Sequence, residues 1–269
     1  MKKKTPVSDD FHSYVKALWI CVATIPLAII FIFLLVRLGF FGELPSTEEI
    51  TNPKSYLATE ILSSDGNQIG TFFHENRVHV EYEEIPENLI NALVSTEDER
   101  FFQHSGIDFR SLGRALISLG SGGGGSTITQ QLAKLMFTPD PARGILVRVL
   151  QKLKEWVIAI EIERRYTKQE ILTMYLNKFD FLYQAVGIHS ASNVYFGKNP
   201  IELNIEESAL LVGMCKNPSY YNPARESRFE LAKNRRNTVL GQLRRNEFIN
   251  DFELDSLRSI PVTLNFNPK

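Results

Sequence analysis

The sequence predicts a mainly α-helical protein with one membrane-spanning helix near its N-terminus. Residues 18–36 form an uncharged apolar run, and apolar residues recur at helical spacing in most segments between 86 and 246. Between these regions, alternating apolar and polar residues around Asp65-Gly66 predict a short β-hairpin. A chain of 269 residues has room for the anchor and one domain with a sizeable core.

Composition narrows the classes of function. The chain has 30 Lys plus Arg against 31 Asp plus Glu, a net charge of −1 and 43% hydrophobic residues. A disordered polyelectrolyte would be less apolar, and a dedicated nucleic-acid binder would carry a basic excess, so no nucleic-acid partner is expected. Cys21 lies inside the apolar run, so a disulfide with Cys215 would join the membrane to the folded domain. We therefore expect two ordinary buried thiols.

The apolar run contains 19 residues, LWICVATIPLAIIFIFLLV. At about 1.5 Å per residue it nearly matches a hydrocarbon core of about 30 Å, which predicts a tail over 1–17 and a transmembrane helix over 18–38. A cleaved signal peptide is the alternative, but the run is longer than a signal peptide needs and no small-x-small site follows it directly. Lysines precede the span and glutamates follow it, so the N-terminus is expected in the cytoplasm and the rest outside.

Three regions are expected after the anchor. Residues 39–82 combine a polar linker containing two prolines with the hairpin, and residues 83–250 form the helical domain. Two loops, at 120–125 and 138–141, interrupt the helices. Residues 251–269 have the composition of an extended polar linker toward a possible missing domain.

The first candidate site residue is Glu97, in the segment STEDERFFQHSG. On a helix, Glu97 shares a stripe with apolar residues such as Leu93 and Phe101, so its carboxylate is expected in apolar surroundings. Burial of that kind raises the pKa of a carboxyl group, which suits a general acid or base near neutral pH. The alternative is a surface acidic cluster, because the neighbouring Asp98 and Glu99 are expected to be solvated. His104 is expected to be a structural hydrogen-bonding residue rather than a metal ligand.

The second candidate is the glycine-rich stretch GGGGSTITQQLAK, from Gly122 to Lys134. Thr127 and Gln130 form a T-x-x-Q capping pattern, which predicts that a helix begins here. A helix N-terminus behind glycines is a ready phosphate site, and Lys134 would add a positive charge. No G-K-[ST] pattern follows, so the stretch is not a nucleotide P-loop. Its composition alone is also that of a flexible linker.

The third candidate is Glu155, which lies on the apolar face of a predicted helix. A buried carboxylate needs a partner or a function, and Lys152 is the nearest candidate partner. Residues 134–168 contain eight basic and four acidic residues within a nearly neutral chain. This local excess favours an anionic substrate, although a solvated helix face would also produce part of it. Together the three features suggest acid/base chemistry on a phosphate-bearing, membrane-borne substrate.

Four segments resemble the ordered motifs of glycosyltransferase family 51, the peptidoglycan glycosyltransferases found alone or in class A penicillin-binding proteins. They are STEDERFFQHSGIDFRSLGRA, GGGGSTITQQLAKLMF, KLKEWVIAIEIERRYTKQEILTMYLNKFDF and GIHSASNVYFGK. The resemblance covers about residues 83–225. It implies a lysozyme-like, mainly α fold with a membrane-proximal jaw, on the outer face of the cytoplasmic membrane.

The resemblance also implies the activity and the residues that perform it. Lipid II would be polymerised into β-1,4 glycan with inversion, and undecaprenyl pyrophosphate would leave. Glu97 would be the general base. Glu155 would help to position the pyrophosphate, either directly or as the ligand of a divalent cation, Mg or Mn. Other wall-synthesis proteins are expected partners. The residues that match positions lining the substrate cleft are Arg114, Ser126, Thr127, Gln130, Gln131, Lys134 and Lys152.

The chain departs from the family pattern at Gln151, where arginine is usual, which should weaken pyrophosphate stabilisation unless Arg148 or Lys154 compensates. No S-x-x-K motif in suitable context appears. The chain is therefore expected to be either a complete monofunctional enzyme or the N-terminal part of a class A protein whose transpeptidase domain is missing, and its linker-like tail favours the second. Two alternative functions stay open. One is a lysozyme-like glycan hydrolase, and the other is a nonenzymatic scaffold in a wall-synthesis complex.

Overall fold

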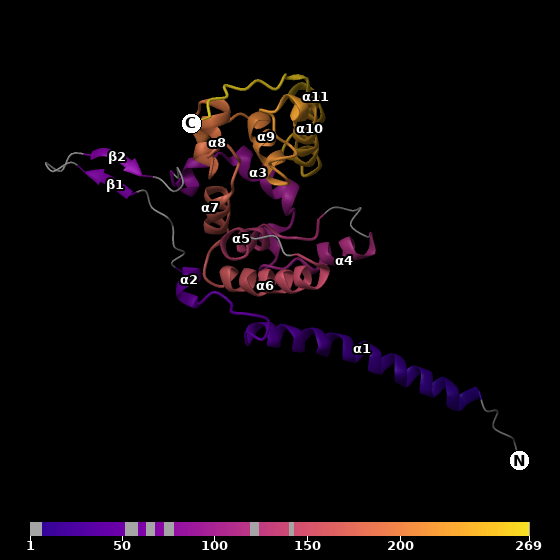
Figure 1. Cartoon of the computed structure of the whole chain (residues 1–269). Helices are drawn as coiled ribbons and strands as arrows, with labels where there is room; N and C mark the ends of the chain where they lie inside the picture. The colour runs from indigo at the N-terminus through magenta and orange to yellow at the C-terminus, as the bar shows by residue number, and fades with distance from the viewer. Residues whose placement is uncertain are drawn as a thin grey trace, which may run out of the picture.

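The computed structural model describes residues 7–51, 59–62, 68–72, 78–118, 124–139 and 143–268. Over these residues the protein is mainly α-helical, as predicted (Figure 1). The longer helices of the body begin and end as follows: α3 Glu87–Glu97, α4 Phe109–Ile117, α5 Ile128–Phe137, α6 Ile145–Glu163, α7 Lys168–Lys178, α8 Ile188–Phe196, α9 Ile205–Cys215, α10 Phe229–Arg245 and α11 Asp251–Ser259. Short 3-10 turns lie at Tyr82–Glu84, Phe101–Gln103, Pro200–Glu202 and Glu226–Arg228.

Helix α1 (Val7–Arg37) contains the predicted span. Its segment Phe11–Arg37 has 27 residues and includes an 18-residue window with a mean hydropathy of 2.8, so it is long and apolar enough to cross a membrane. Figure 1 shows α1 extending away from the body. The prediction of a buried thiol at Cys21 is wrong in this structure, because Cys21 lies on the exposed surface of α1, whereas Cys215 is buried in the body.

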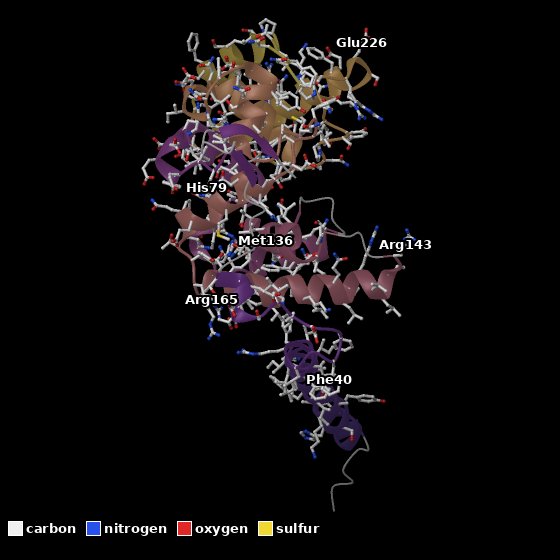
Figure 2. The ribbon with its side chains drawn as sticks, turned by 60° about the vertical axis from the view of Figure 1, so that its left-hand side comes forward. Phe40, His79, Met136, Arg143, Arg165 and Glu226 are labelled. Atoms are coloured by element: carbon white, nitrogen blue, oxygen red, sulfur yellow. The ribbon has the colours of Figure 1, made fainter. Side chains whose placement is uncertain are left out.

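The end of α1 packs against α6, and the short helix α2 (Thr47–Thr51) is bound to the residues that follow α6. The rings of Phe33 and Trp156 stack with centroids 5.9 Å apart. The hydroxyl of Tyr166, which follows α6, donates to the carbonyl of Ile50 in α2 at 2.8 Å. Figure 2 shows Phe40 and Arg165 on this same side of the body. The apolar helix therefore reaches the body at α6, the helix that carries Lys152 and Glu155.

Strands β1 (Thr59–Leu62) and β2 (Gln68–Phe72) pair in antiparallel fashion in the region where the sequence predicts a hairpin. Thr59 pairs with Phe72, and a register shift lies between Ile61 and Leu62. The predicted turn at Asp65-Gly66 lies outside the described residues. In Figure 1 the pair lies to one side of the helical body.

The body has one core formed by two groups of helices. Helices α3, α9 and α10 pack together, and α5 packs against α6 and α7. Leu93, Leu132, Tyr175 and Leu211 are fully buried members of the shared cluster. Figure 1 shows α4, α5 and α6 nearest α1, with α9, α10 and α11 at the opposite end. The end of α3 and the start of α5 lie where the two groups meet.

The segment after Asn250 differs from the extended linker that its composition predicts. Asn250 and Glu253 form a capping box, and helix α11 begins at Asp251. Leu254 is buried and α11 packs on α10, which supplies the apolar contact that a short helix needs. Only the chain after Ser259 is extended, and it lies along α8 through backbone hydrogen bonds to Val194 and Tyr195.

Candidate active site

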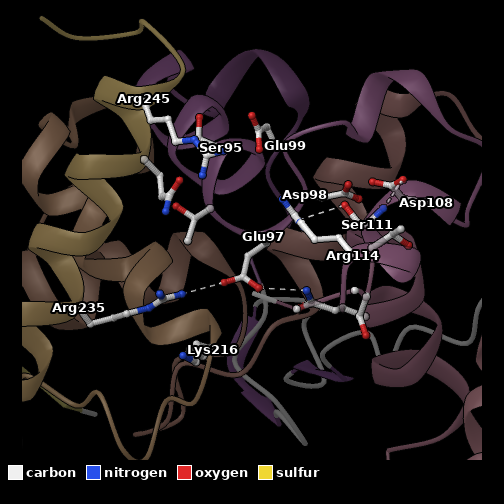
Figure 3. Close-up of a pocket in the computed structure, with 17 residues that line it drawn as sticks. Ser95, Glu97, Asp98, Glu99, Asp108, Ser111, Arg114, Lys216, Arg235 and Arg245 are labelled. Atoms are coloured by element: carbon white, nitrogen blue, oxygen red, sulfur yellow. Dashed lines mark hydrogen bonds and ion pairs between the residues drawn. The ribbon is translucent and has the colours of Figure 1, made fainter. Parts of the chain in front are cut away.

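Glu97 is the last residue of α3, and its carboxylate is held by two donors from distant parts of the chain (Figure 3). Gln131 Nε2 donates to Glu97 Oε2 at 3.2 Å, and Arg235 Nη2 donates to Oε1 at 3.2 Å. The side chain of Glu97 is 14% exposed. The carboxylate is therefore shielded from bulk water, as expected, but its surroundings are not apolar, because a guanidinium from α10 faces it.

Two adjoining cavities meet at Glu97. The smaller has a volume of about 320 Å³ and the larger about 830 Å³, and Glu97, Ser126, Gln131 and Lys216 line both. Each of the other predicted site residues lines one of them. Arg114 and Thr127 line the smaller cavity, whereas Gln130, Lys134, Lys152 and Glu155 line the larger. The structure thus brings all nine predicted site residues to one cleft.

The segment after Glu97 docks onto the start of α5. Thr127 is the N-cap, and its hydroxyl accepts from Gln130 N at 3.1 Å while donating to the carbonyl of Gly106 at 2.8 Å. Asp98 Oδ2 accepts from Ile128 N at 3.0 Å. The predicted cap at Thr127 is confirmed, and the same contacts fix the position of Glu97 relative to Gln131.

Asp98 also corrects two predictions. It is 6% exposed rather than solvated, and His104 Nε2 lies 3.0 Å from both of its carboxylate oxygens. Because Asp98 occupies the Ile128 N–H and Thr127 occupies the Gln130 N–H, these donors at the start of α5 are already used. Two of the N–H groups that a phosphate at this helix N-terminus would use are thus taken by side chains of the protein itself. Gly122 lies outside the described residues, and Gly125 packs close to Ala115 of α4.

Glu155 is buried on α6, and Lys152 is its partner, as the sequence predicts. Lys152 Nζ lies 3.0 Å from Glu155 Oε2 and donates to Ser126 Oγ at 2.9 Å. The Lys152 side chain is 36% exposed and lines the larger cavity, so its ammonium reaches the cleft while it neutralises Glu155. Ser126, which directly precedes the N-cap of α5, is thereby tied to α6.

The side chain of Gln151 is tied to the end of α5. Its Nε2 donates to the carbonyl of Thr138 at 2.9 Å, and Gln151 lines the larger cavity. Arg148 lines the same cavity and is placed to compensate for the missing charge. Lys154 is not, because its Nζ lies against the backbone of Gly42 after α1.

Three groups at Glu97 lie beyond the sequence predictions. Arg235 sits in an arginine-rich stretch of α10 outside the region of resemblance, and sequence spacing does not show which arginine faces the cleft. Tyr175 donates to Gln131 Oε1 at 3.0 Å and so turns the Gln131 Nε2 toward Glu97.

Burial, with Cys215 and Glu97 nearby, holds the pKa of Tyr175 well above its usual range, so its hydroxyl keeps its proton and remains a donor. Burial also raises the pKa of the Cys215 thiol well above its usual range.

The residues present can hold a divalent cation only if a bound substrate supplies most of its ligands. Within the described part of the chain, no group of three or more His, Cys, Asp or Glu side chains could hold a metal ion. Two predicted site residues in the larger cavity, Glu97 and Glu155, carry carboxylates. Glu155 is the expected metal ligand, and Lys152 already contacts it. Mg²⁺ is commonly bound by one or two carboxylates together with substrate phosphates. The site is therefore suited to a cation that arrives with, and is mostly bound by, a phosphate-bearing substrate.

Comparison with known proteins places this geometry in a family. A family model described as "Transglycosylase" matches residues 65–244. Penicillin-binding protein 1A of Vibrio cholerae is 37% identical over 232 residues, covering 83% of this chain and 27% of that protein. Penicillin-binding protein 1A of Escherichia coli is 35% identical over 229 residues, covering 84% of this chain and 26% of that protein. Penicillin-binding protein 1F of Bacillus subtilis is 39% identical, covering 72% and 27%.

The chain spans about a quarter of the length of these curated relatives. A crystal structure of penicillin-binding protein 1A from Haemophilus influenzae aligns with a TM-score of 0.45 and 23% identity, covering 79% of this chain and 22% of that one. That likeness is too loose to support the assignment, which rests on the family match over residues 65–244. The chain that carries Glu97, the α5 cap and the buried Glu155 belongs to the transglycosylase family.

Proposed function

We propose that this chain is a peptidoglycan glycosyltransferase that polymerises lipid II, with Glu97 as the general base. The observation that supports this most directly is the position of Glu97 at the junction of two cavities, one of which carries Lys134, Arg148 and Lys152. A sugar on one side of Glu97 and a pyrophosphate on the other would both lie within reach of its carboxylate.

The proposed reaction is a displacement at the anomeric carbon. Glu97 accepts the proton of the 4-hydroxyl of the acceptor sugar, and that oxygen attacks the anomeric carbon of the growing lipid-linked glycan. A β-1,4 bond forms as the bond from the anomeric carbon to the phosphate oxygen breaks. Undecaprenyl pyrophosphate leaves with the bonding electrons, and the configuration inverts.

The proposed pyrophosphate position is the larger cavity. Charge that develops on the leaving group is stabilised by cations held in place before the reaction, and Lys134, Arg148 and Lys152 supply them. The start of α5 does not, since Asp98 already accepts from Ile128 N. The side chains of the cavity, rather than the helix N-terminus, would therefore bind the phosphates.

A divalent cation, Mg or Mn, is part of the proposal, with Glu155 as its protein ligand. Such an ion would neutralise the pyrophosphate oxygens as they gain charge. Glu155 serves a second purpose in this arrangement, because its ion pair with Lys152 holds that ammonium at the mouth of the cavity.

We propose that α1 anchors the enzyme in the cytoplasmic membrane with its body on the outer face. The apolar length of α1 and the lysines that precede it support this orientation. We also propose a lysozyme-like fold with a membrane-proximal jaw. Large apolar side chains are exposed on α4 and at the start of α6, the helices nearest α1: Phe109, Ile117, Ile145 and Leu146.

The test is a lipid II polymerisation assay on the full chain in detergent with a divalent cation. Wild type should form glycan strands, and Glu97→Gln should lose about 10²–10⁴-fold in rate, the range expected for a missing general base. Glu87→Gln removes an exposed carboxylate from the other end of the same helix and should change little. Equal rates for wild type and Glu97→Gln, or no polymer from any of them, would refute the proposal.

A further inference from the structure

Three consecutive residues that are not glycine adopt the left-handed backbone conformation directly beside the cleft. Leu182, Tyr183 and Gln184 have φ values of 68°, 52° and 62°. Side-chain-bearing residues rarely adopt this conformation, and a run of three persists only where surrounding contacts hold it. The turn is closed by Phe181 N donating to the carbonyl of Ala185 at 2.9 Å and by Ala185 N donating to that of Leu182 at 2.8 Å.

This turn forms part of the wall of the larger cavity. Asp180 and Leu182 line that cavity together with Glu97 and Lys152. Asp180 Oδ1 accepts from Leu182 N at 2.8 Å, so the two lining residues are tied to each other. A change in the backbone at 182–184 would therefore move the surface that a bound substrate meets.

The outer side of the turn is covered by the C-terminal strap, which we define as residues 260–268. Asn265 N donates to the carbonyl of Tyr195 at 3.0 Å, and Asn267 N donates to that of Val194 at 2.9 Å. Between these two bonds, the ring of Phe266 lies edge-on to Tyr183 with centroids 5.0 Å apart, and 5.6 Å from the centroid of Tyr195. Tyr183 is thus held by a ring from the far end of the described chain.

The start of the strap is fixed by a buried arginine. Arg236 is 1% exposed, and it donates to the carbonyls of Ile260 at 2.8 Å and Arg258 at 3.2 Å. Its neighbour in α10, Arg235, donates to Glu97. Both ends of the strap therefore meet elements that line the cleft.

We propose that the C-terminal strap positions the cleft wall, and that Phe266 is its positioning residue. Phe266 holds Tyr183 and so keeps Asp180 and Leu182 in place for substrate binding, without contacting substrate itself. Loss of its ring would loosen the wall and weaken binding of lipid II in the cleft, while the chemistry at Glu97 would continue. The kinetic part of this inference rests on the proposed function.

The experiment compares Phe266→Ala with Phe252→Ala in the full chain in detergent. Phe252 is a phenylalanine on α11 whose side chain is 84% exposed, so it serves as the matched control. In Phe266→Ala, amide exchange of a peptide covering 179–188 should accelerate, KM for lipid II should rise about fivefold and kcat should stay within about twofold. Phe266→Tyr keeps the ring, so its amide exchange at 179–188 and its KM should be close to those of wild type. Phe252→Ala should match wild type in all three quantities.

Phe266→Leu keeps an apolar contact and supplies the answer if the alanine variant does not fold; it should change exchange and KM in the same direction by less. The proposal is overturned if the folded variants leave exchange at 179–188 unchanged, or if kcat falls while KM does not. Should wild type form no glycan, the proposed function fails, and the exchange measurement still decides whether the strap holds the turn.

Discussion

Arg235 and Glu97 lie 138 positions apart in the sequence, and the guanidinium of one donates a 3.2 Å hydrogen bond to the carboxylate of the other. Glu97 ends α3 and Arg235 projects from α10, so the packing of these two helices creates the pair. Both side chains are largely buried. The bond directs one oxygen of Glu97 toward α10, while Gln131 directs the other toward α5.

We expect Arg235→Ala to lower kcat of polymerisation by about 10–100-fold, because the carboxylate loses its charged partner and its fixed orientation. Arg235→Lys should recover only part of the rate, since an ammonium lacks the planar fork of a guanidinium. Arg244→Ala is the control, because Arg244 lies on the same helix and pairs with Asp251 at the exposed surface. Steady-state kinetics that show equal kcat for Arg235→Ala and Arg244→Ala would contradict this role.

Lys152→Met should both destabilise the protein and weaken substrate binding. It leaves the buried Glu155 without its ion-pair partner, which should cost about 1–2 kcal/mol, below the full cost of a buried pair because Lys152 is 36% exposed. KM for lipid II should rise, since a cation of the larger cavity is removed. Lys154→Met is the matched control, because Lys154 faces Gly42. Urea unfolding and kinetics of the two variants should separate them, and identical behaviour would disprove the assignment.

Gln151→Arg should lower KM for lipid II by about 3–10-fold, because it adds a charge beside the proposed pyrophosphate position. The same change removes the hydrogen bond from Gln151 Nε2 to the carbonyl of Thr138. Gln151→Leu removes that bond without adding charge, so the difference between the two variants isolates the charge. If arginine and leucine give the same KM, then Arg148 already supplies what this position lacks.

Thr127→Ala should lower the free energy of unfolding by about 1–2 kcal/mol, because the cap of α5 and the bond to the Gly106 carbonyl are both lost. Gln130 Nε2 still donates to that carbonyl, at 3.1 Å, which limits the cost. Thr127→Ser retains a hydroxyl and should remain close to wild type. Denaturant titrations of the three proteins test this, and a serine variant as unstable as the alanine variant would count against the cap.

Because the Cys215 thiol is buried, we expect the free energy of unfolding of the protein to fall in mild alkali. Burial, with the Glu97 charge nearby, raises the pKa of its thiol in the folded protein, whereas an unfolded thiol ionises near pH 8.5. Above that pH the folded state binds one more proton than the unfolded state, so stability should fall by up to about 1.4 kcal/mol per pH unit. Below that pH the stabilising difference is fully present.

Denaturant unfolding between pH 8 and 10 measures this slope, and Cys215→Ala should remove the thiol's share of it. The alanine variant starts from a lower stability because it leaves a small cavity, so the comparison is between slopes. A slope that is the same in wild type and variant would show that Cys215 does not cause the effect.

Local sequence patterns predicted correctly those features that depend on neighbouring residues. Thr127 and Gln130 lie three positions apart, and the cap between them follows from helix geometry alone. Lys152 and Glu155 meet for the same reason, since residues three apart share a helix face. The apolar stretch within α1 follows from a run of uncharged residues.

Predictions that required knowledge of distant partners were the ones that failed. Asp98 looked like a solvated neighbour of Glu97, yet it is buried because His104 and the N–H of Ile128 converge on it. The start of α5 looked like a free phosphate site for the same reason. The chain after Asn250 looked like a linker because the apolar surface that Leu254 covers belongs to another part of the fold.

The sequence by itself therefore determined the apolar helix and the mainly helical body, because these follow from composition and periodicity. It also predicted nine candidate site residues, most of them through the resemblance to a known family rather than through periodicity or spacing. The tertiary structure alone decided that Arg235 faces Glu97, that Asp98 closes the start of α5 and that Phe266 covers Tyr183. Each of those contacts joins residues from different elements. The distance between the residues of each pair is set by how the helices and the strap pack, and local sequence patterns do not predict that packing.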